Sequence, residues 1–342
     1  MSLKASFEKK VFEFKRPSGT SRGVLTEKKA WFISVWNQEN PEIKGVGECS
    51  IIPGLSPDYE NDESYEKVIK AVVKDADSFS LNIKELKEFP SIYFGLEMAL
   101  LDLKNGGKGI YFDTEFTRGK QSLPINGLIW MGDEEFMQSQ ITQKLAEGFS
   151  CIKMKIGAID FDKELEILAG IRKQVSAEEI TLRVDANGAF TPEDAPEKLR
   201  KLSQFELHSI EQPIKQGQIE EMQTLCAKNI LPIALDEELI GIHDYEEKKQ
   251  LLDNIQPQYI ILKPSLIGGF KGSKEWIELA EERNIPWWIT SALESNVGLD
   301  AIAQFTSTYE ITLPQGLGTG ALYTNNTPSL LRVENGELRR EL

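Results

Sequence analysis

The apolar positions of the chain follow two different rhythms, one over roughly the first 120 residues and another over the rest. In the first part, segments 5–14, 29–37 and 43–48 are rich in Val, Ile, Phe and Trp and are separated by turn-forming residues. This pattern predicts an antiparallel sheet. The separators 16–23 (RPSGTSRG) and 51–57 (IIPGLSP) are built on Pro, Gly and Ser, and we expect both to be loops.

Two helical patterns complete this first part, at about 58–76 and 90–104. The second presents an apolar face through Phe94, Met98 and Leu101 and ends in the glycines of NGGKG. Strands followed by helices predict an α+β unit at the start of the chain.

From Leu123 onward, short apolar runs alternate with helical patterns. The runs are PINGLIW (124–130), CIKMKI (151–156), ITLRVD (180–185), HSIEQP (208–213), PIALDE (232–237), YIILKP (259–264), PWWITS (286–291) and ITLP (311–314). Helical patterns between most of them cover 133–147, 160–175, 192–203, 218–228, 244–253 and 273–283. This alternation predicts an α/β fold with a parallel sheet, and eight such strands fit a closed barrel. An open doubly wound sheet is the alternative, but no glycine-rich phosphate-binding sequence follows the first strand.

Composition and charge exclude several classes of function. The chain has 342 residues with 39 basic and 54 acidic side chains, a net charge of −15, which disfavours nucleic acid and anionic membranes as partners. No apolar stretch approaches ~18 residues, and the N-terminus lacks the apolar core of a signal peptide. Cys49, Cys151 and Cys226 lack metal-ligand spacing and suit a reducing cytoplasm. With only His208 and His243, the chain has no multi-histidine metal site.

Charged residues stand where successive apolar strands end. They are Lys153, Lys155, Asp185, Glu211, Asp236 and Lys263. From one strand to the next the spacing is about 25 to 30 residues, which matches one strand and one helix. We therefore expect these side chains to converge on one mouth of the barrel, and the C-terminal mouth is where barrel enzymes carry their active sites.

The three carboxylates predict a metal site. Asp185, Glu211 and Asp236 would repel one another unless a hard divalent cation neutralised them. Mg²⁺ is the natural choice and Mn²⁺ would also fit, since either leaves positions for substrate oxygens. Asn187 and Glu237 stand beside these ligands in the sequence and are candidates to support them. The alternative is that each acid merely caps a helix.

The lysines predict acid–base chemistry. Lys153 and Lys155 are two apart on one strand and therefore face the same side, whereas Lys263 comes from the sixth strand across the mouth. Mutual repulsion and burial are expected to lower a lysine pKa towards the ~7–8 that suits a general base. The alternative is that these lysines are exposed to solvent. Their apolar neighbours in CIKMKI and YIILKP argue against it.

Together these groups suit removal of a proton next to a carboxylate. A metal ion and a cationic lysine would stabilise the enediolate where its charge develops, and a second lysine would take the proton. β-Elimination, racemisation or cycloisomerisation could follow.

Six segments in order resemble the enolase superfamily, muconate-lactonizing subgroup. They are KMK (153–155), RVDANGAF (183–190), IEQP (210–213), LDE (235–237), LKPS (262–265) and TSALESNVG (290–298). The resemblance implies an α+β capping domain over residues 1–120, a modified (β/α)7β barrel over 121–315, and a C-terminal segment, 316–342, that returns to the cap. It also implies Mg²⁺ with a lysine base.

Within the subgroup, the segments 47–56 (GECSIIPGLS), 291–295 (SALES) and 313–320 (LPQGLGTG) resemble the o-succinylbenzoate synthases. That resemblance implies syn dehydration of 2-succinyl-6-hydroxy-2,4-cyclohexadiene-1-carboxylate to o-succinylbenzoate, a step of menaquinone biosynthesis. It implies that Lys155 removes the α-proton and then protonates the departing hydroxyl, while Lys263 stays cationic. The three carboxylates would hold Mg²⁺.

Other activities stay open on sequence grounds. N-Acylamino acid racemisation needs only the two opposed lysines. Dipeptide epimerisation is disfavoured, because the DxD pattern of those enzymes is absent from 311–320. A barrel that forms a Schiff base through Lys263 or Lys155, and a barrel without catalytic activity, rank lower.

Recognition of a small carboxylate substrate is expected from the loops 16–26 and 47–57 and from residues near the last strands. The candidates are Arg22, Ser291, Glu294, Ser295, Gly318 and Thr319. His208 and His243 are expected to have no chemical role, and the sequence leaves open whether the protein forms a homo-oligomer.

Overall fold

The computed structural model describes residues 2–20, 23–130 and 132–342. Its N-terminal part begins with the antiparallel sheet β1 (Leu3–Thr20), β2 (Gly23–Asn37) and β3 (Asn40–Ser50), in that order. The register of β1 against β2 shifts between Glu13 and Ser18, and pairing then resumes as far as Thr20 opposite Gly23. The predicted loop at 16–23 was therefore wrong for its first five residues, because a bulge lets the strands continue through Pro17 and Gly19.

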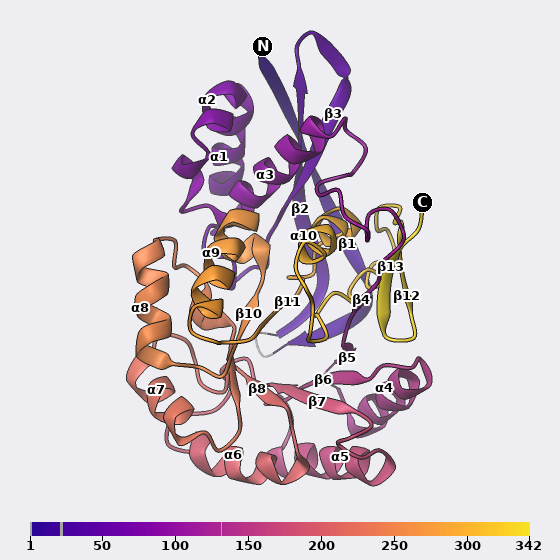
Figure 1. Ribbon diagram of the computed structural model, residues 1–342, viewed down its shortest axis with the longest axis vertical. Coiled ribbons are helices and arrows are strands. Elements are labelled where there is room, and N and C mark those ends of the chain that lie inside the picture. Colours follow the sequence, from indigo (N-terminus) through magenta and orange to yellow (C-terminus); the bar gives the residue numbers. More distant parts are fainter. Residues whose placement is uncertain (1, 21–22, 131) are drawn as a thin grey trace.

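Helices cover one face of this sheet and make the cap (Figure 1). They are α1 (Asp62–Lys74), α2 (Ala76–Leu81), η1 (Ile83–Leu86) and α3 (Pro90–Lys104). α1 begins where the Asn61 side chain accepts a hydrogen bond from the Ser64 N–H, and α3 begins at Pro90, a residue suited to the first helical turn. Buried apolar side chains such as Trp31, Ile69 and Leu96 join the sheet to the helices.

β3 packs on α3 at glycines. A Cβ atom at Gly47 would lie 1.8 Å from the carbonyl oxygen of Gly95, so only glycine allows this strand to approach the helix so closely.

This contact gives a stability prediction. Gly47→Ala is expected to lower the free energy of unfolding by about 2–4 kcal/mol, because backbone must move to admit the methyl group. Gly170→Ala is the matched control: this glycine lies inside a helix, and an added Cβ would meet only the Gln138 side chain, at an ordinary contact distance of 3.9 Å, so the change should stabilise by about 0.5–1 kcal/mol. Thermal melting of both variants tests the pair, and an unchanged melting temperature for Gly47→Ala would contradict the prediction.

The second part of the chain is a parallel sheet of seven strands, in the spatial order β11-β10-β9-β8-β7-β6-β5. The strands are β5 (Gly127–Ile129), β6 (Cys151–Lys155), β7 (Thr181–Asp185), β8 (Ser209–Glu211), β9 (Ile233–Leu235), β10 (Tyr259–Leu262) and β11 (Trp287–Ile289). Isolated parallel bridges join Gln315 to Ile125 and Gly316 to Thr290, so segment 315–316 links the two outer edges. The last strand predicted, 311–314, is not a strand, because this linking pairing begins one residue later.

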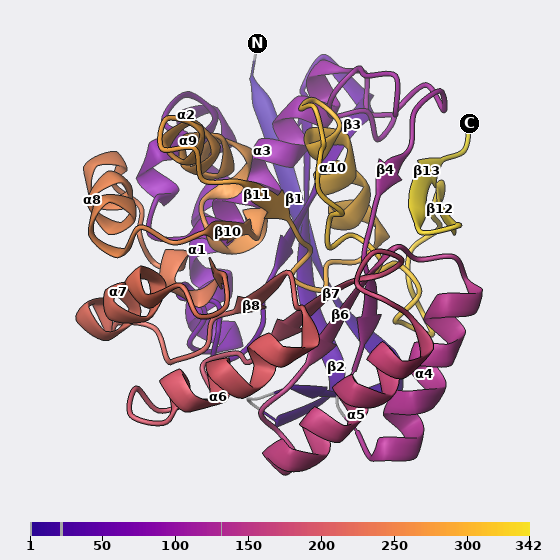
Figure 2. The same ribbon diagram turned by 60° about the horizontal axis from the view of Figure 1, so that its bottom comes forward.

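Helices follow most strands and line the outer side of the sheet (Figure 2). They are α4 (Glu134–Ala146), α5 (Phe161–Gln174), α6 (Ala195–Leu202), α7 (Ile219–Lys228), α8 (Tyr245–Ile255), α9 (Gly269–Glu281) and α10 (Asn296–Thr306). Short 3₁₀ turns lie at η2 (Ser203–Phe205), η3 (Glu237–Leu239) and η4 (Pro264–Leu266). One continuous apolar core fills the space between sheet and helices. The α/β fold with its cap agrees with the prediction, and the open doubly wound alternative is excluded.

The C-terminal segment runs back along the molecule. Its backbone first bonds to β1 of the cap, where the Lys15 N–H donates to the Leu322 carbonyl and the Thr324 N–H to the Glu13 carbonyl. It then forms the hairpin β12 (Leu331–Glu334) and β13 (Glu337–Arg340), which pairs with β4 (Leu123–Pro124).

Two features of the sequence can be checked directly. Over the described residues, no helix has the length and apolar character needed to cross a membrane. Cys49, Cys151 and Cys226 are buried and free of disulfide bonds.

Candidate active site

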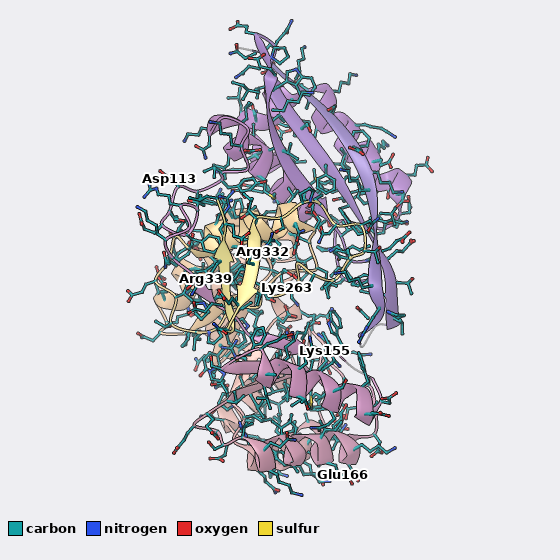
Figure 3. All side chains as sticks on the ribbon, turned by 90° about the vertical axis from the view of Figure 1, so that its right-hand side faces the viewer. Asp113, Lys155, Glu166, Lys263, Arg332 and Arg339 are labelled. Carbon is teal, nitrogen blue, oxygen red and sulfur yellow. The ribbon has the colours of Figure 1, made fainter. Side chains whose placement is uncertain are left out.

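Strand register brings the charged residues to one end of the sheet. Lys155 stands opposite Asp185, and Asp185 stands opposite Glu211 on the next strand. Asp236 and Lys263 directly follow β9 and β10. Lys155 and Lys263 are largely buried, with side chains 13% and 12% accessible, and Figure 3 labels both in the middle part of the molecule. The predicted convergence at the C-terminal ends of the strands is thus what the structure shows.

Two lysines of β6 contact the first two carboxylates. Lys153 Nζ lies 2.7 Å from Glu211 Oε2 and 3.1 Å from Asp185 Oδ2. Lys155 Nζ lies 3.2 Å from Asp185 Oδ2 and donates to Asn187 Oδ1 at 2.8 Å.

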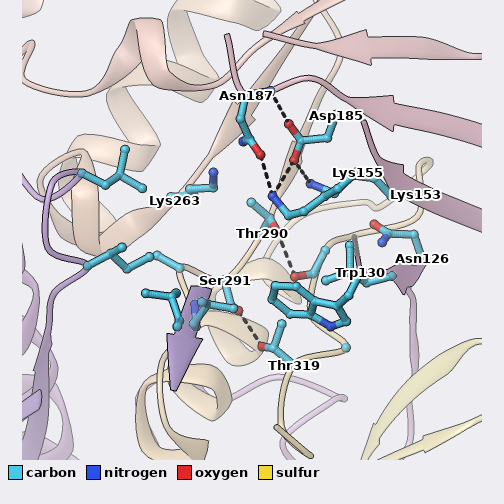
Figure 4. A pocket seen from close by; sticks show the side chains of 18 of the residues that line it. Asn126, Trp130, Lys153, Lys155, Asp185, Asn187, Lys263, Thr290, Ser291 and Thr319 are labelled. Atoms are coloured by element: carbon cyan, nitrogen blue, oxygen red, sulfur yellow. Dashed lines mark hydrogen bonds and ion pairs between the residues drawn. The ribbon is translucent and has the colours of Figure 1, made fainter. Parts of the chain in front are cut away.

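Lys263 reaches the carboxylates from the other side. Its ammonium group forms an ion pair with Asp236, and its Nζ lies 3.9 Å from Glu211 Oε1. Figure 4 shows Lys263 facing Lys155 across the pocket. A substrate bound between them would meet one ammonium group on each side.

Burial and charge work against each other in this cluster. Burial alone would raise the pKa of Asp185, but Lys155, Lys153 and Lys263 lower it below its ordinary range. Burial would lower the pKa of Lys153, yet Glu211 and Asp185 raise it above the ordinary value. The expectation of a lowered lysine pKa is therefore wrong for Lys153, because its carboxylate neighbours outweigh the effect of burial.

The donor set fits a hard divalent cation. Asp185, Glu211 and Asp236 are each no more than 2% exposed, and Glu211 Oε1 is a buried oxygen that accepts no hydrogen bond from the described residues. Within the described ranges, no three His, Cys, Asp or Glu side chains are already arranged as a metal cage, and the carboxylates are turned towards the lysines instead. Carboxylate oxygens are the ligands that Mg²⁺ and Mn²⁺ prefer, so these three residues could hold either ion.

Asn187 connects Lys155 to the carboxylates. It adopts a left-handed backbone conformation with φ 43°, which its short polar side chain tolerates. Its N–H donates to Asp185 Oδ1 at 3.1 Å, and its side-chain amide donates to Glu237 Oε1 at 3.2 Å. Asn187 therefore fixes the direction of Lys155 as well as that of a carboxylate.

The lysines open into a pocket that both parts of the chain enclose (Figure 4). The pocket is lined by three lysines, Lys153, Lys155 and Lys263, together with Asp185 and Asn187. Both loop regions expected to confer specificity contribute apolar side chains, namely Leu25, Ile52, Pro53 and Leu55.

Only some of the candidate substrate-binding residues line the pocket. Ser291, Thr319 and Gly318 line the pocket, and the two hydroxyls lie 2.6 Å apart. Glu294 and Ser295 are fully buried outside its lining. Arg22 lies outside the described residues.

Glu294 and Ser295 have partners of their own. Ser295 is the N-cap of α10 and its hydroxyl donates to Glu48 Oε2 at 2.6 Å. Glu294 Oε1 accepts from the Ser265 hydroxyl at 2.5 Å, two residues beyond Lys263. These contacts hold the start of α10 against the cap and fix the turn that follows Lys263.

Several lining residues were missed from the sequence. They include Asn126, Leu128, Trp130, Thr290, Ala292, Leu293 and Gly316. The first three stand two apart in β5 and at its two ends and therefore share a face, a pattern that the sequence already contained. Neither His208 nor His243 lines this pocket; His208 stacks on Tyr259 with 4.7 Å between ring centroids.

Glu164 on α5 supports the turn that follows Lys155. Its Oε1 accepts the Gly157 N–H at 2.6 Å, and the side chain is 1% exposed. Burial raises the pKa of Glu164 to about 7, even though backbone N–H groups and Lys198 lower it in part.

A pH dependence of stability follows. The folded pKa lies above the unfolded value of 4.5, so this group's contribution is present below pH 4.5 and is lost as pH rises to about 7. Glu164→Gln keeps an acceptor for Gly157 and removes the charge, so we expect it to be more stable than the wild type by about 1–2 kcal/mol at pH 8, with little difference at pH 4. Melting curves at both pH values test this. An equal effect of the substitution at pH 4 and pH 8 would contradict the predicted pH dependence.

The comparison with known families decides the identity of the fold. Residues 137–341 match the family described as Enolase C-terminal domain-like. The chain belongs to the enolase superfamily. The resemblance seen in the sequence is therefore confirmed, and members of this superfamily pair a lysine or histidine base with one or two Mg²⁺ ions.

Individual enolase-superfamily proteins are similar over nearly the whole chain. An o-succinylbenzoate synthase from Desulfotalea psychrophila is 51% identical over 98% of each chain. The crystal structure of MenC from the same organism superposes with a TM-score of 0.87 at 47% identity, over 99% of this chain and 100% of the other. A muconate lactonizing enzyme from Pseudomonas fluorescens has the same fold, with a TM-score of 0.82 at 21% identity over 99% of this chain and 93% of its own.

Proposed function

We propose that this protein is an o-succinylbenzoate synthase, which dehydrates 2-succinyl-6-hydroxy-2,4-cyclohexadiene-1-carboxylate to o-succinylbenzoate in menaquinone biosynthesis. The observation that carries the proposal is the 51% identity to an o-succinylbenzoate synthase over 98% of both chains. The buried lysines and carboxylates support it, because they are the groups this elimination needs.

Lys155 is the base. In its neutral form the Lys155 amine removes the ring proton next to the carboxylate and becomes an ammonium group. It then gives a proton to the hydroxyl on the same face of the ring, which leaves as water. One residue can do both because abstraction and departure are syn, and the ring becomes aromatic as the C–O bond breaks.

Lys263 acts on the opposite side of the pocket. It stays cationic, because Asp236 and Glu211 raise its pKa above the ordinary value although burial alone would lower it. A fixed positive charge there stabilises the enediolate that forms when the proton leaves.

Asp185, Glu211 and Asp236 would hold Mg²⁺, or Mn²⁺ in its place. The bound ion would act as a Lewis acid towards the substrate carboxylate and lower the cost of the charge that develops there. Lys153, which contacts two of these carboxylates, keeps them oriented.

The rest of the pocket suits a small carboxylate with an uncharged ring. Leu25, Ile52 and Leu55 from the cap exclude water, and the paired hydroxyls of Ser291 and Thr319 offer hydrogen bonds to the succinyl chain.

A second candidate is racemisation of N-acylamino acids. It is favoured by Lys155 and Lys263, which line opposite sides of one pocket and could exchange a proton on either face. Fast exchange of the α-proton of an N-succinyl amino acid in D₂O, without dehydratase activity, would mean that racemisation and not dehydration is the function of this protein.

A spectrophotometric assay of o-succinylbenzoate formation tests the main proposal. We expect turnover with Mg²⁺, loss of turnover with EDTA, and recovery when Mg²⁺ is returned. Absence of product under all of these conditions, from a protein that is folded, would reject the function.

A further inference from the structure

One polar side chain in the pocket has no task in the mechanism above. Asn126, just before β5, lines the pocket but is only 4% exposed. Among the described residues, no group donates a hydrogen bond to its Oδ1, and this oxygen is buried. Its amide nitrogen donates only weakly, at 3.3 Å, to the neighbouring Gly127 carbonyl. A buried acceptor without a donor is destabilising, so we expect a bound molecule to supply the donor.

The backbone holds Asn126 in place. Its N–H donates to the Gln315 carbonyl at 2.9 Å, which fixes the strand end against segment 315–316. The side chain is therefore presented by a rigid element, as a residue that orients substrate should be.

The order of the strands puts Asn126 on the side of the pocket that carries Lys155. β5 is the direct neighbour of β6, with Leu128 opposite Lys153, whereas β10 and Lys263 lie four strands away from β6. Figure 4 agrees: Asn126 lies on the side where Lys153 and Lys155 enter, away from Lys263.

The proposed dehydration needs such an acceptor on that side. The hydroxyl that leaves is on the same ring face as the proton removed, so it also faces Lys155. To be protonated, its oxygen must turn a lone pair towards the Lys155 ammonium group, which requires its own hydrogen to point elsewhere. An uncharged acceptor beside Lys155 fixes that rotation without competing for the proton.

We propose that Asn126 Oδ1 accepts the hydrogen of the leaving hydroxyl and thereby orients its oxygen towards Lys155. The inference rests on the proposed function. Lys155 gives one proton to the hydroxyl oxygen, the C–O bond breaks with its electron pair on that oxygen, and water departs. The electron pair of the enediolate forms the new ring double bond, and Asn126 is chemically unchanged.

Two substitutions separate this role from others. Asn126→Ala removes the acceptor and should lower kcat by about 10- to 30-fold, the effect of one well-placed hydrogen bond, with KM changed less than about threefold. Asn126→Gln keeps an uncharged amide acceptor, so it should retain more of the wild-type kcat than Asn126→Ala does. Asn82→Ala is the matched control, since Asn82 is exposed and its side chain caps no helix.

Deuterium incorporation supplies a readout that a merely structural role would not move. In D₂O, substrate recovered from Asn126→Ala at partial conversion should carry deuterium at the α-carbon, because Lys155 still removes the proton while departure of the hydroxyl has become slower. Wild-type enzyme should return substrate with several-fold less deuterium. The melting temperature of each variant confirms that it is folded.

The other outcomes overturn the inference. Unchanged kcat in Asn126→Ala would show that the hydroxyl needs no acceptor there. A large rise in KM, or a fall in kcat without deuterium in recovered substrate, would show that Asn126 binds the succinyl chain or supports the fold instead. If wild-type protein forms no o-succinylbenzoate, the proposed function itself has failed, and the two failures are thus distinguishable.

Discussion

Replacing Lys155 by alanine is expected to lower kcat for o-succinylbenzoate formation by about 10³- to 10⁴-fold. General acid–base groups contribute about 10²- to 10⁴-fold each, and Lys155 performs two proton transfers in the same turnover. KM should change little, because Lys155 contributes less to binding than to the proton transfers. The assay is steady-state product formation at saturating Mg²⁺.

Lys120→Ala is the control for this experiment, since Lys120 is an exposed lysine whose side chain is 66% accessible. Its activity should match that of wild type. If Lys155→Ala kept more than about a tenth of wild-type kcat, the proton would have to leave by another route, and the assignment of Lys155 as base would be wrong.

Replacing Lys263 by alanine is expected to lower kcat by about 10²- to 10³-fold. The loss removes a positive charge that faces the developing enediolate, and fixed charges at such positions have effects of this size. Lys263→Arg keeps the charge and should recover part of the activity. Asp236 and Glu211 would lose a cationic partner in the alanine variant, so its melting temperature must be measured alongside.

The deuterium content of recovered substrate separates the two lysines. Lys155→Ala should leave the α-proton unexchanged in D₂O, because the group that removes it is gone. Lys263→Arg should still exchange it. Exchange in Lys155→Ala together with no exchange in Lys263→Arg would mean that the roles are reversed.

The convergence of the charged residues could be predicted from the sequence because strand endings are local features. Lys155, Asp185 and Glu211 each close an apolar run, and parallel strands of similar length must bring their ends together. Spacing alone therefore placed these residues at one mouth.

The electrostatics could not be predicted in the same way. The sign of the pKa shift of Lys153 depends on how many carboxylates surround the ammonium group and at what distance, which only the folded chain shows. Proximity of two lysines in the sequence gave the opposite expectation.

The residues that line the pocket were harder still to predict, because neighbours in the sequence have different structural roles. Ser291 lines the pocket, whereas Ser295 caps α10 four residues later. A β-bulge carries β1 past Pro17, although Pro and Gly there predicted a loop. Register shifts and caps of this kind depend on tertiary pairing, which a local pattern does not contain.

The most direct test of the whole account is a calorimetric titration of Mg²⁺ into wild-type protein and into Asp185→Asn, Glu211→Gln and Asp236→Asn. We expect a single site in the wild type and an affinity at least about tenfold weaker in each variant, because each loses a charged oxygen ligand. Glu164→Gln, which alters another buried carboxylate, should bind as the wild type does. Wild-type affinity in all three amide variants, or no binding by the wild type, would contradict the claim that these carboxylates hold the metal between the two lysines.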